Sequence, residues 1–210
     1  MELVLYTNPM SRGRIARWML EEIAEPYCVE VVGYGAEMKG PQFRAINPMG
    51  KVPALTHDKT VVTECAGIIA YLADAFPQAG LLPVTPEERG AYYRWMFFAA
   101  GPVEAAVTNR NLGIEVPADK RRMVGYDTYE TVMDTLEGVL SRTPYITGDR
   151  FTAADVYLGS QISWGLQFGT IDRRPAFADY AARVVTRPAW GRANDLDNAL
   201  ARDLAPPAQT

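Results

Sequence analysis

The sequence predicts an α/β domain followed by an all-helical domain, and three observations support this prediction. Residues 1–77 alternate between short, β-rich apolar runs and segments whose apolar residues recur at helical spacing. Residues 78–87 contain proline and glycine without periodicity, which is typical of a linker. Residues 88–210 carry only helical signals. A chain of 210 residues is long enough for one or two modest domains, and the change of pattern at residues 78–87 predicts two.

The chain begins with a predicted strand, turn and helix. Leu3 to Tyr6 form a short apolar run, and Thr7 to Pro9 end it, because proline cannot continue a strand ladder. The next apolar residues share one helical face: Ile15, Trp18, Met19 and Ile23. A second strand from Tyr27 to Val32 should run parallel to the first, since a helix connects the two. Cys28 lies within this strand and is expected in the core.

The rest of the first domain is predicted to contain a loop, a hairpin and a helix. Residues 33–40 are expected to form a loop, and Pro41 to Ile46 one or two helical turns. The hairpin pairs a strand from Pro53 to His57 with one from Thr60 to Thr63. Glu64 then starts a helix. Its apolar face consists of Ile68, Ile69, Leu72, Ala73 and Phe76. The predicted order is therefore βαβ followed by ββα.

The second half shows four further apolar helical faces. Their residues are Tyr92, Met96, Ala99 and Val103; Val132, Leu136, Val139 and Leu140; Phe177, Tyr180, Ala181, Val184 and Val185; and Trp190, Ala193, Leu200 and Leu204. Thr152 and Asp155 have the spacing of a capping box in its Asp variant, before a helix that is apolar all round and should be buried. We expect these two residues to serve folding and not chemistry. The Pro-rich end, residues 205–210, has no pattern.

Composition and charge exclude several classes of function. The net charge is −4 and there is no basic block, which argues against a nucleic-acid partner. No apolar run is long enough for a membrane span, and the start lacks the features of a secretory signal, so a cytoplasmic location is expected. Two cysteines, Cys28 and Cys65, form no metal or disulfide pattern. The single histidine, His57, excludes most His-based triads and metal sites.

Ser11 lies where the first strand gives way to the first helix. Free backbone N–H groups and the positive end of the helix dipole make such a junction suitable for binding an anion. A serine there can also be a plain N-cap. Arg14 and Arg17 follow in the first turns of the helix, where a cation is unfavourable, and they suggest an anion or an acidic partner nearby.

Four segments resemble the glutathione transferase family in their order and spacing. They are Leu5–Arg14, similar to the catalytic turn of the serine-type members; Asn47–Leu55, similar to the glutathione-binding loop; Thr63–Ile68, similar to the Glu-Ser motif with Cys65 in place of serine; and Gly148–Asp155, similar to the capping-box segment. The resemblance spans nearly the whole chain. It implies a thioredoxin-like N-terminal domain and a C-terminal helical bundle.

The resemblance implies that Ser11 stabilises the glutathione thiolate. A free thiol is only a few per cent ionised at neutral pH, and a hydroxyl hydrogen bond beside a helix N-terminus favours the reactive form. Arg12 could reach the sulfur or a carboxylate, or it could be a solvated surface residue.

The same resemblance assigns five further residues to glutathione binding. Val52 and Pro53 would pair with its cysteinyl backbone across a cis peptide, although a trans proline that opens a strand fits the sequence equally well. Lys51 could pair with the glycine carboxylate, and Glu64 would receive the γ-glutamyl ammonium. Cys65 keeps a backbone donor for the γ-glutamyl carboxylate but offers only a weak S–H.

The sequence is therefore interpreted as a glutathione transferase that activates the glutathione thiolate through Ser11, and this thiolate attacks a small apolar electrophile. Glutathione is the co-substrate, no metal is expected, and the family implies a homodimer. Two alternatives remain open. A glutathione-dependent isomerase, dehalogenase or lyase would use the same site, and a non-enzymatic binding protein could share the fold.

Overall fold

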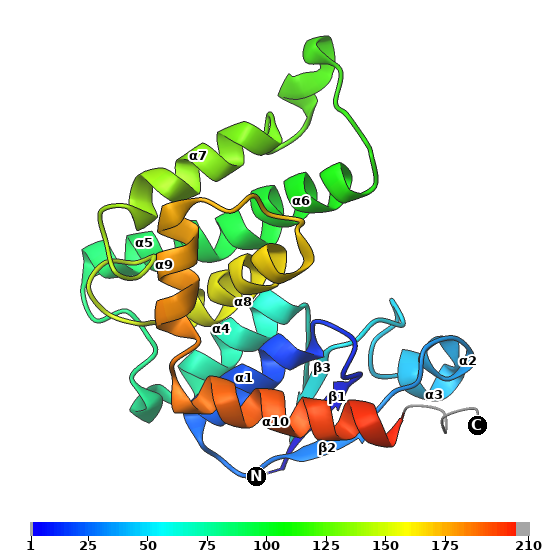
Figure 1. Ribbon diagram of the computed structural model, residues 1–210. Coiled ribbons are helices and arrows are strands. Elements are labelled where there is room, and N and C mark those ends of the chain that lie inside the picture. The colour runs from blue at the N-terminus through cyan, green and yellow to red at the C-terminus, as the bar shows by residue number, and fades with distance from the viewer. Residues whose placement is uncertain (1, 205–210) are drawn as a thin grey trace. The chain divides into compact units, whose positions relative to one another are not determined.

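The computed structural model describes residues 2–204 and divides the chain into two compact units. One unit contains the residues up to Ala79 together with those from Arg187 onward, and the other runs from Gly80 to Thr186 (Figure 1). The predicted domain boundaries at 77 and 88 remain predictions, and the Pro-rich segment 205–210 lies outside the described residues. Among residues 2–204, no helix combines the length and apolar character needed to cross a bilayer.

The first unit is built on a mixed four-stranded sheet with the order β2-β1-β3-β4. Its strands are β1 (Leu3–Thr7), β2 (Cys28–Val31), β3 (Ala54–His57) and β4 (Thr60–Thr63). Strand β1 pairs in parallel with β2 and antiparallel with β3, and β3 and β4 form the predicted hairpin. The βαβ and ββα order predicted from the sequence is therefore confirmed.

Two helices in the N-terminal part of the unit are the ones that apolar periodicity predicted there. These are α1 (Gly13–Ile23) and α4 (Cys65–Ala75), and the apolar residues predicted for their faces are all buried. The expected loop at 33–40 is wrong in one respect, because it contains a single helical turn, α2 (Ala36–Lys39). The turns predicted at Pro41 form α3 (Pro41–Arg44). The remaining short element is a 3₁₀ turn, η1 (Pro77–Ala79).

Cys28 is exposed, so its predicted core position is wrong. Strand β2 is an edge strand, and its residues alternate between exposed and half-buried positions. Cys28 occupies one of the exposed positions. An apolar or small residue in a strand pattern does not indicate which face of an edge strand is covered.

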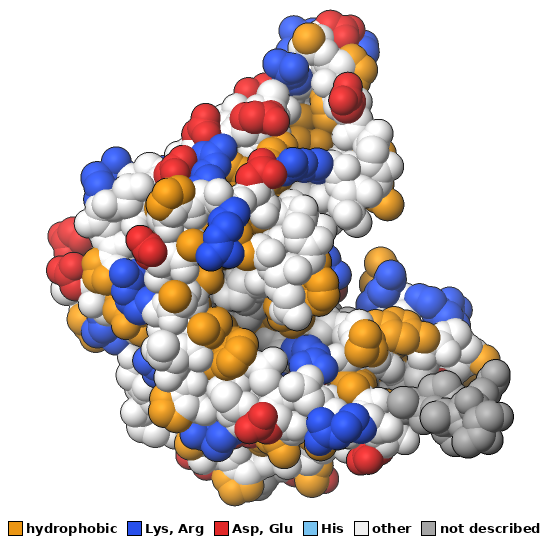
Figure 2. Space-filling model, viewed as in Figure 1, with side chains coloured by type: hydrophobic (Ala, Val, Ile, Leu, Met, Phe, Trp, Pro, Cys, Tyr) orange, Lys and Arg blue, Asp and Glu red, His pale blue; other side chains and the backbone are white. Residues whose placement is uncertain are grey.

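The last helix, α10 (Pro188–Asp203), packs along α1 in the same unit (Figure 1). Its buried residues are Ala189, Ala193 and Asp197, spaced four apart on one face. The expected position of Leu204 on that face is wrong, because this side chain is exposed. One of the three buried positions of α10 is thus occupied by a charged residue, Asp197, where sequence patterning would place an apolar one. The surface of the face that carries α10 has interspersed basic and acidic side chains (Figure 2).

The second unit is helical. Its elements are α5 (Pro86–Phe98), a π-turn η2 (Ala99–Val103), α6 (Glu104–Asn111), a 3₁₀ turn η3 (Ala118–Met123), α7 (Tyr129–Leu140), α8 (Ala153–Phe168) and α9 (Pro175–Val184). The predicted burial of α8 holds for its first two turns, whereas Trp164 and Leu166 are half-buried. Val139 and Val185 are likewise half-buried. The fold class predicted from the sequence, an α/β domain followed by helices, is confirmed.

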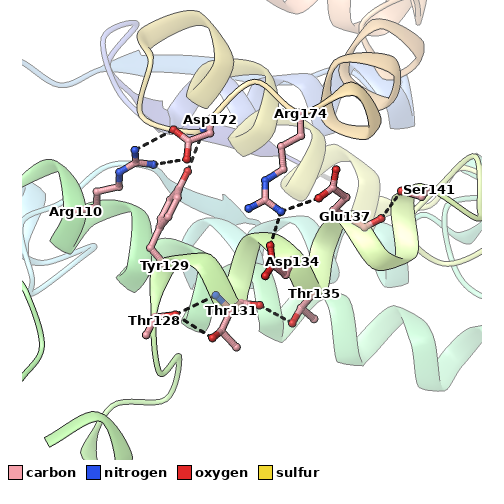
Figure 3. Close-up of polar contacts among 10 residues, drawn as sticks. All are labelled: Arg110, Thr128, Tyr129, Thr131, Asp134, Thr135, Glu137, Ser141, Asp172 and Arg174. Carbon is pink, nitrogen blue, oxygen red and sulfur yellow. Dashed lines mark hydrogen bonds and ion pairs between the residues drawn. The ribbon is translucent and has the colours of Figure 1, made fainter. Parts of the chain in front are cut away.

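Surface ion pairs join α6 and α7 to the segment before α9 (Figure 3). The Arg110 guanidinium donates two hydrogen bonds, of 2.9 and 3.0 Å, to Asp172, and it lies 4.0 Å above the Tyr129 ring. The Tyr129 hydroxyl accepts a hydrogen bond of 3.0 Å from the Asp172 backbone N–H. Arg174 pairs with Asp134 and Glu137. Exposed pairs of this kind contribute little stability individually, at most about 1 kcal/mol each.

Thr152 and Asp155 form the capping box at the start of α8. Asp155 is fully buried and accepts hydrogen bonds from the backbone N–H groups of Ile146 and Thr152, at 2.8 and 2.9 Å. The hydroxyls of Thr152 and Tyr180 complete the set, at 3.1 and 2.9 Å. Burial raises the pKa of Asp155 from 3.8 to about 6, against these hydrogen bonds, which favour the charged form.

Replacing Asp155 with asparagine should remove the pH dependence of the free energy of unfolding that the Asp155 carboxyl causes. Between about pH 4 and about pH 6 the folded protein holds a proton that the unfolded chain has released. The free energy of unfolding therefore falls as the pH rises through this window, by about 3 kcal/mol for a pKa difference of about two units. Urea unfolding of both proteins from pH 4 to pH 7 should show this slope only in the wild type. Parallel curves would contradict the assignment.

Candidate functional site

Ser11 lies in the turn between β1 and α1, and its hydroxyl is held on both sides. The Oγ atom donates a hydrogen bond of 2.7 Å to the Asn8 carbonyl and accepts one of 2.9 Å from the Gly13 N–H. The Ser11 backbone N–H donates to the same Asn8 carbonyl at 3.0 Å. Ser11 is half-buried and lies two residues before the first residue of α1.

Asn8 fixes this turn to the sheet. Its buried side chain donates to the Val32 carbonyl at 3.0 Å and accepts from the Met10 N–H at 3.0 Å. Val32 follows β2 directly, so the turn after β1 is tied to the end of the neighbouring parallel strand. The sequence indicated only that the segment from Thr7 to Pro9 ends the first strand, because a bond across 24 positions leaves no local pattern.

Gly13 allows α1 to start close to the strand. A Cβ at this position would lie 1.8 Å from Thr7 Oγ1 and 3.0 Å from Ser11 Oγ. Thr7 is fully buried, so its side chain has no space into which to move. A residue without a side chain is therefore required for steric reasons and not for backbone conformation.

Replacing Gly13 with alanine should lower the free energy of unfolding by about 1 to 3 kcal/mol, the usual cost of overpacking. The added methyl group must displace Thr7 or the first turn of α1. Gly138→Ala is a matched control, because Gly138 lies in the last turn of α7 and a Cβ there meets nothing within 4 Å. It should stabilise the protein by about 0.5 to 1 kcal/mol. Denaturant unfolding measures both changes. Equal stabilisation by the two substitutions would contradict the close packing at Gly13.

The loop at residues 47–53 is organised by a buried asparagine. Asn47 donates a hydrogen bond of 2.7 Å to the Lys51 carbonyl and accepts one of 3.1 Å from the Met49 N–H. The Val52–Pro53 peptide is cis, which decides between the two forms that the sequence left open. Val52 is half-buried and Lys51 is exposed.

Lys39 braces the same loop from the short helix α2. Its ammonium donates to the carbonyls of Met49 and Gly50, at 3.2 and 2.6 Å. Gly50 has a positive φ of 57°, and a Cβ there would lie 2.8 Å from the Met38 carbonyl oxygen. Neither Lys39 nor Asn47 was among the predicted site residues, since both act on backbone carbonyls and not through a recognisable motif.

Glu64 and Cys65 lie at the N-terminus of α4. Glu64 is exposed and has a φ of 64°, in the region where non-glycine residues are uncommon. Strained backbone of this kind often occurs at ligand-binding positions. Cys65 is buried, and its Sγ lies 3.6 Å from the Arg12 carbonyl, to which the thiol donates. The start of α4 is thereby linked to the Ser11 turn.

The register of the sheet brings these segments to one edge. Tyr6 pairs with Ala54, and Ala54 pairs with Thr63. The turn after β1, the cis peptide before β3 and the start of α4 after β4 therefore lie at the same end of three neighbouring strands. His57 is at the other end of the hairpin, where its Nδ1 lies 2.8 Å from the Tyr71 hydroxyl and its ring stacks on Phe76.

The arrangement offers helix N-termini and hydroxyl and backbone groups, which suit an anionic peptide ligand. Within residues 2–204 no group of three or more His, Cys, Asp or Glu side chains could hold a metal ion.

Comparison with known proteins assigns the family. The model of the glutathione S-transferase N-terminal domain matches residues 10–75. The glutathione S-transferase GstA of Escherichia coli O157:H7 is 32% identical over 152 residues, which cover 71% of this chain and 75% of that protein. The chain belongs to the glutathione S-transferase family. The matched range, residues 10–75, contains the positions of Ser11, Val52, Pro53, Glu64 and Cys65.

Solved structures of the glutathione S-transferase family share the fold. A glutathione transferase from Methylococcus capsulatus is 28% identical and superimposes with a TM-score of 0.75, covering 94% of this chain and 99% of that one. A glutathione transferase homologue from Sulfitobacter, with bound glutathione, is 28% identical with a TM-score of 0.74, covering 93% and 98%. The resemblance seen in the sequence is therefore confirmed at the level of the family.

Proposed function

We propose that this protein binds glutathione at the sheet edge described above and uses Ser11 to stabilise its thiolate for attack on an apolar electrophile. The observation that carries the proposal is the double anchoring of the Ser11 hydroxyl. Gly13 N–H holds the oxygen, while the hydroxyl proton points to a carbonyl that already accepts the Ser11 N–H. The proton can therefore turn to a bound sulfur without leaving the Asn8 carbonyl unpaired.

The proposed reaction uses the thiol of glutathione, the electrophile, solvent and the Ser11 hydroxyl. Glutathione loses its thiol proton to solvent, and the Ser11 hydroxyl donates to the thiolate. The sulfur then forms a bond to the electrophilic carbon as the bond to the leaving group breaks, and the leaving group departs as an anion. A depression of the thiol pKa by one to two units would be worth about 1.4 to 3 kcal/mol.

The other site residues would hold the tripeptide. Val52 would pair with the cysteinyl backbone, Glu64 would receive the γ-glutamyl ammonium, and the Cys65 N–H at the start of α4 would donate to the γ-glutamyl carboxylate. Lys51 and Arg12 are exposed and would supply positive charge for the remaining carboxylate and the sulfur. A homodimer is also proposed, which sedimentation velocity would test.

Cys65 supports a second candidate, a binding protein without catalysis. Its thiol points to the Arg12 carbonyl and is a weaker donor than the serine hydroxyl of the family motif. Calorimetric titration with reduced glutathione, together with a conjugation assay on a chlorinated nitrobenzene, separates the possibilities. We expect binding and chloride release. Binding without turnover would favour the second candidate, and no binding at millimolar glutathione would contradict both.

A further inference from the structure

Arg14 joins the Ser11 turn to the last helix. It is the second residue of α1, and it is half-buried. Its Nε donates a hydrogen bond to the carbonyl of Pro9, within the turn. Its Nη1 donates one of 2.9 Å to the side-chain oxygen of Asn198 on α10. One guanidinium group thus bridges backbone next to the proposed thiolate site and a residue 184 positions away.

The residue beside Asn198 anchors α10 on α1. Asp197 is fully buried and forms an ion pair of 2.8 Å with Arg17, which is 4% exposed. Arg14 and Arg17 lie about one helical turn apart on α1, and Asp197 and Asn198 are neighbours on α10. The buried ion pair holds this part of α10 against α1, next to the exposed Asn198 that accepts from Arg14.

Two other ion pairs hold the opposite end of α1. Arg187 donates two hydrogen bonds, of 2.6 and 2.7 Å, to Glu22, and Arg192 donates two of 2.9 Å to Glu21, one to its carboxylate and one to its backbone carbonyl. Glu21 and Glu22 lie in the last turn of α1, at the end away from the Ser11 turn. Arg14, by contrast, donates both to α10 and to the turn.

A cation in the first turn of a helix is unfavourable beside the positive end of the dipole. Here the guanidinium faces the Pro9 carbonyl and the Asn198 amide oxygen, which offset that repulsion. Arginine suits this geometry because its rigid planar fork donates from two nitrogens in fixed directions. A lysine side chain carries one compact ammonium group on a flexible stem and cannot reproduce the same bridge.

We propose that Arg14 is a positioning residue that, with Asn198, holds the Ser11 turn in the geometry needed to stabilise the glutathione thiolate. The proposal rests on the proposed function of Ser11. Arg14 acts on the turn through the Pro9 carbonyl and not on the substrate.

The test compares Arg14→Met, Arg14→Lys and Asn198→Ala with Arg192→Met as the matched control. Arg192→Met removes an arginine from the same helix pair without touching the turn. The pKa of the bound glutathione thiol, followed by the ultraviolet absorbance of the thiolate, should rise by about half a unit to one unit in Arg14→Met. This corresponds to a fall of about 3- to 10-fold in the ionisation constant of the thiol, and in thiolate and kcat when they are measured at a pH below its pKa. KM for glutathione should change less than about twofold, which indicates that binding is retained.

Arg14→Lys should resemble Arg14→Met, Asn198→Ala should shift the thiol pKa in the same direction by less, and Arg192→Met should leave it unchanged. Hydrogen exchange gives a readout that does not depend on activity: the amides of Ser11 and Gly13 should exchange about tenfold faster in Arg14→Met. An unchanged thiol pKa in Arg14→Met, or a wild-type value in Arg14→Lys, would overturn the proposal. If the wild type does not bind glutathione, the proposed function fails, and unchanged exchange would then overturn the role of Arg14 in the turn.

Discussion

Ser11→Ala is expected to lower kcat for glutathione conjugation by about 10- to 150-fold, since a hydrogen bond to a charged group is worth about 1.5 to 3 kcal/mol. The hydroxyl of Ser11 would contact the sulfur and no other part of the tripeptide, whereas Val52, Glu64 and Cys65 would hold its backbone and γ-glutamyl group. The dissociation constant of glutathione should therefore change less than about threefold. The pKa of the bound thiol should rise toward its value near 8.5 in free solution.

Steady-state kinetics, calorimetric binding and a pH titration of the bound thiol measure these three effects. The matched control is Ser141→Ala, because Ser141 makes a similar bond of 2.7 Å to a carbonyl at the end of α7, in the other unit. That variant should keep wild-type kcat. Because Ser11 also accepts the Gly13 N–H, thermal unfolding of Ser11→Ala should be recorded in parallel. A wild-type kcat in a folded Ser11→Ala protein would remove Ser11 from the mechanism.

Asp197→Ala is expected to lower the free energy of unfolding by about 3 to 5 kcal/mol. The substitution leaves the Arg17 guanidinium, which is 4% exposed, without its carboxylate. Removing one partner of a buried ion pair is costly because the remaining charge has neither water nor a counter-charge. Burial raises the pKa of Asp197, and the positive charges of Arg17 and Arg14 oppose this change. The two arginines therefore favour the charged form of the Asp197 carboxyl.

The double variant Arg17→Met with Asp197→Leu separates the pair from the packing. Two apolar side chains of similar size often replace a buried ion pair without loss, and the double variant should return to within about 1 kcal/mol of the wild type. Arg192→Met breaks an exposed ion pair between the same helices and should cost less than about 1 kcal/mol. Denaturant unfolding at constant m-value gives all three numbers. A small cost for Asp197→Ala, similar to that of Arg192→Met, would contradict the importance of the buried pair.

The sequence predicted the elements that have a strong local period. Strand β1, helix α1 and the hairpin of β3 and β4 each show a change of period at the right place, and the sheet order follows from short connections. It did not predict α2, because four residues are too few to show a helical period. It placed Cys28 wrongly, because the exposure of a strand residue depends on where its strand lies in the sheet.

The candidate site could be predicted only as far as its residues lie in motifs. Ser11, Pro53 and Glu64 stand beside turns and helix starts that the sequence reveals. Arg17 was noted as an unfavourable cation that suggested an acidic partner, and the structure supplies one in Asp197. The partner itself could not be found from the sequence, because an apolar helical face shows that something covers it but not which helix does so.

The place of α10 has a consequence for the way the protein is made. The four strands of the sheet and α1 leave the ribosome first, and residues 80–186 follow before α10 is synthesised. Until then the nascent chain exposes the surface of α1 that α10 later covers, and the Arg17 side chain has no Asp197 with which to pair. Because segments of a nascent chain fold in the order in which they appear, the unit that bears Ser11 reaches its final form only after the helical unit has been made. The N-terminal part of the chain is therefore the last to be completed.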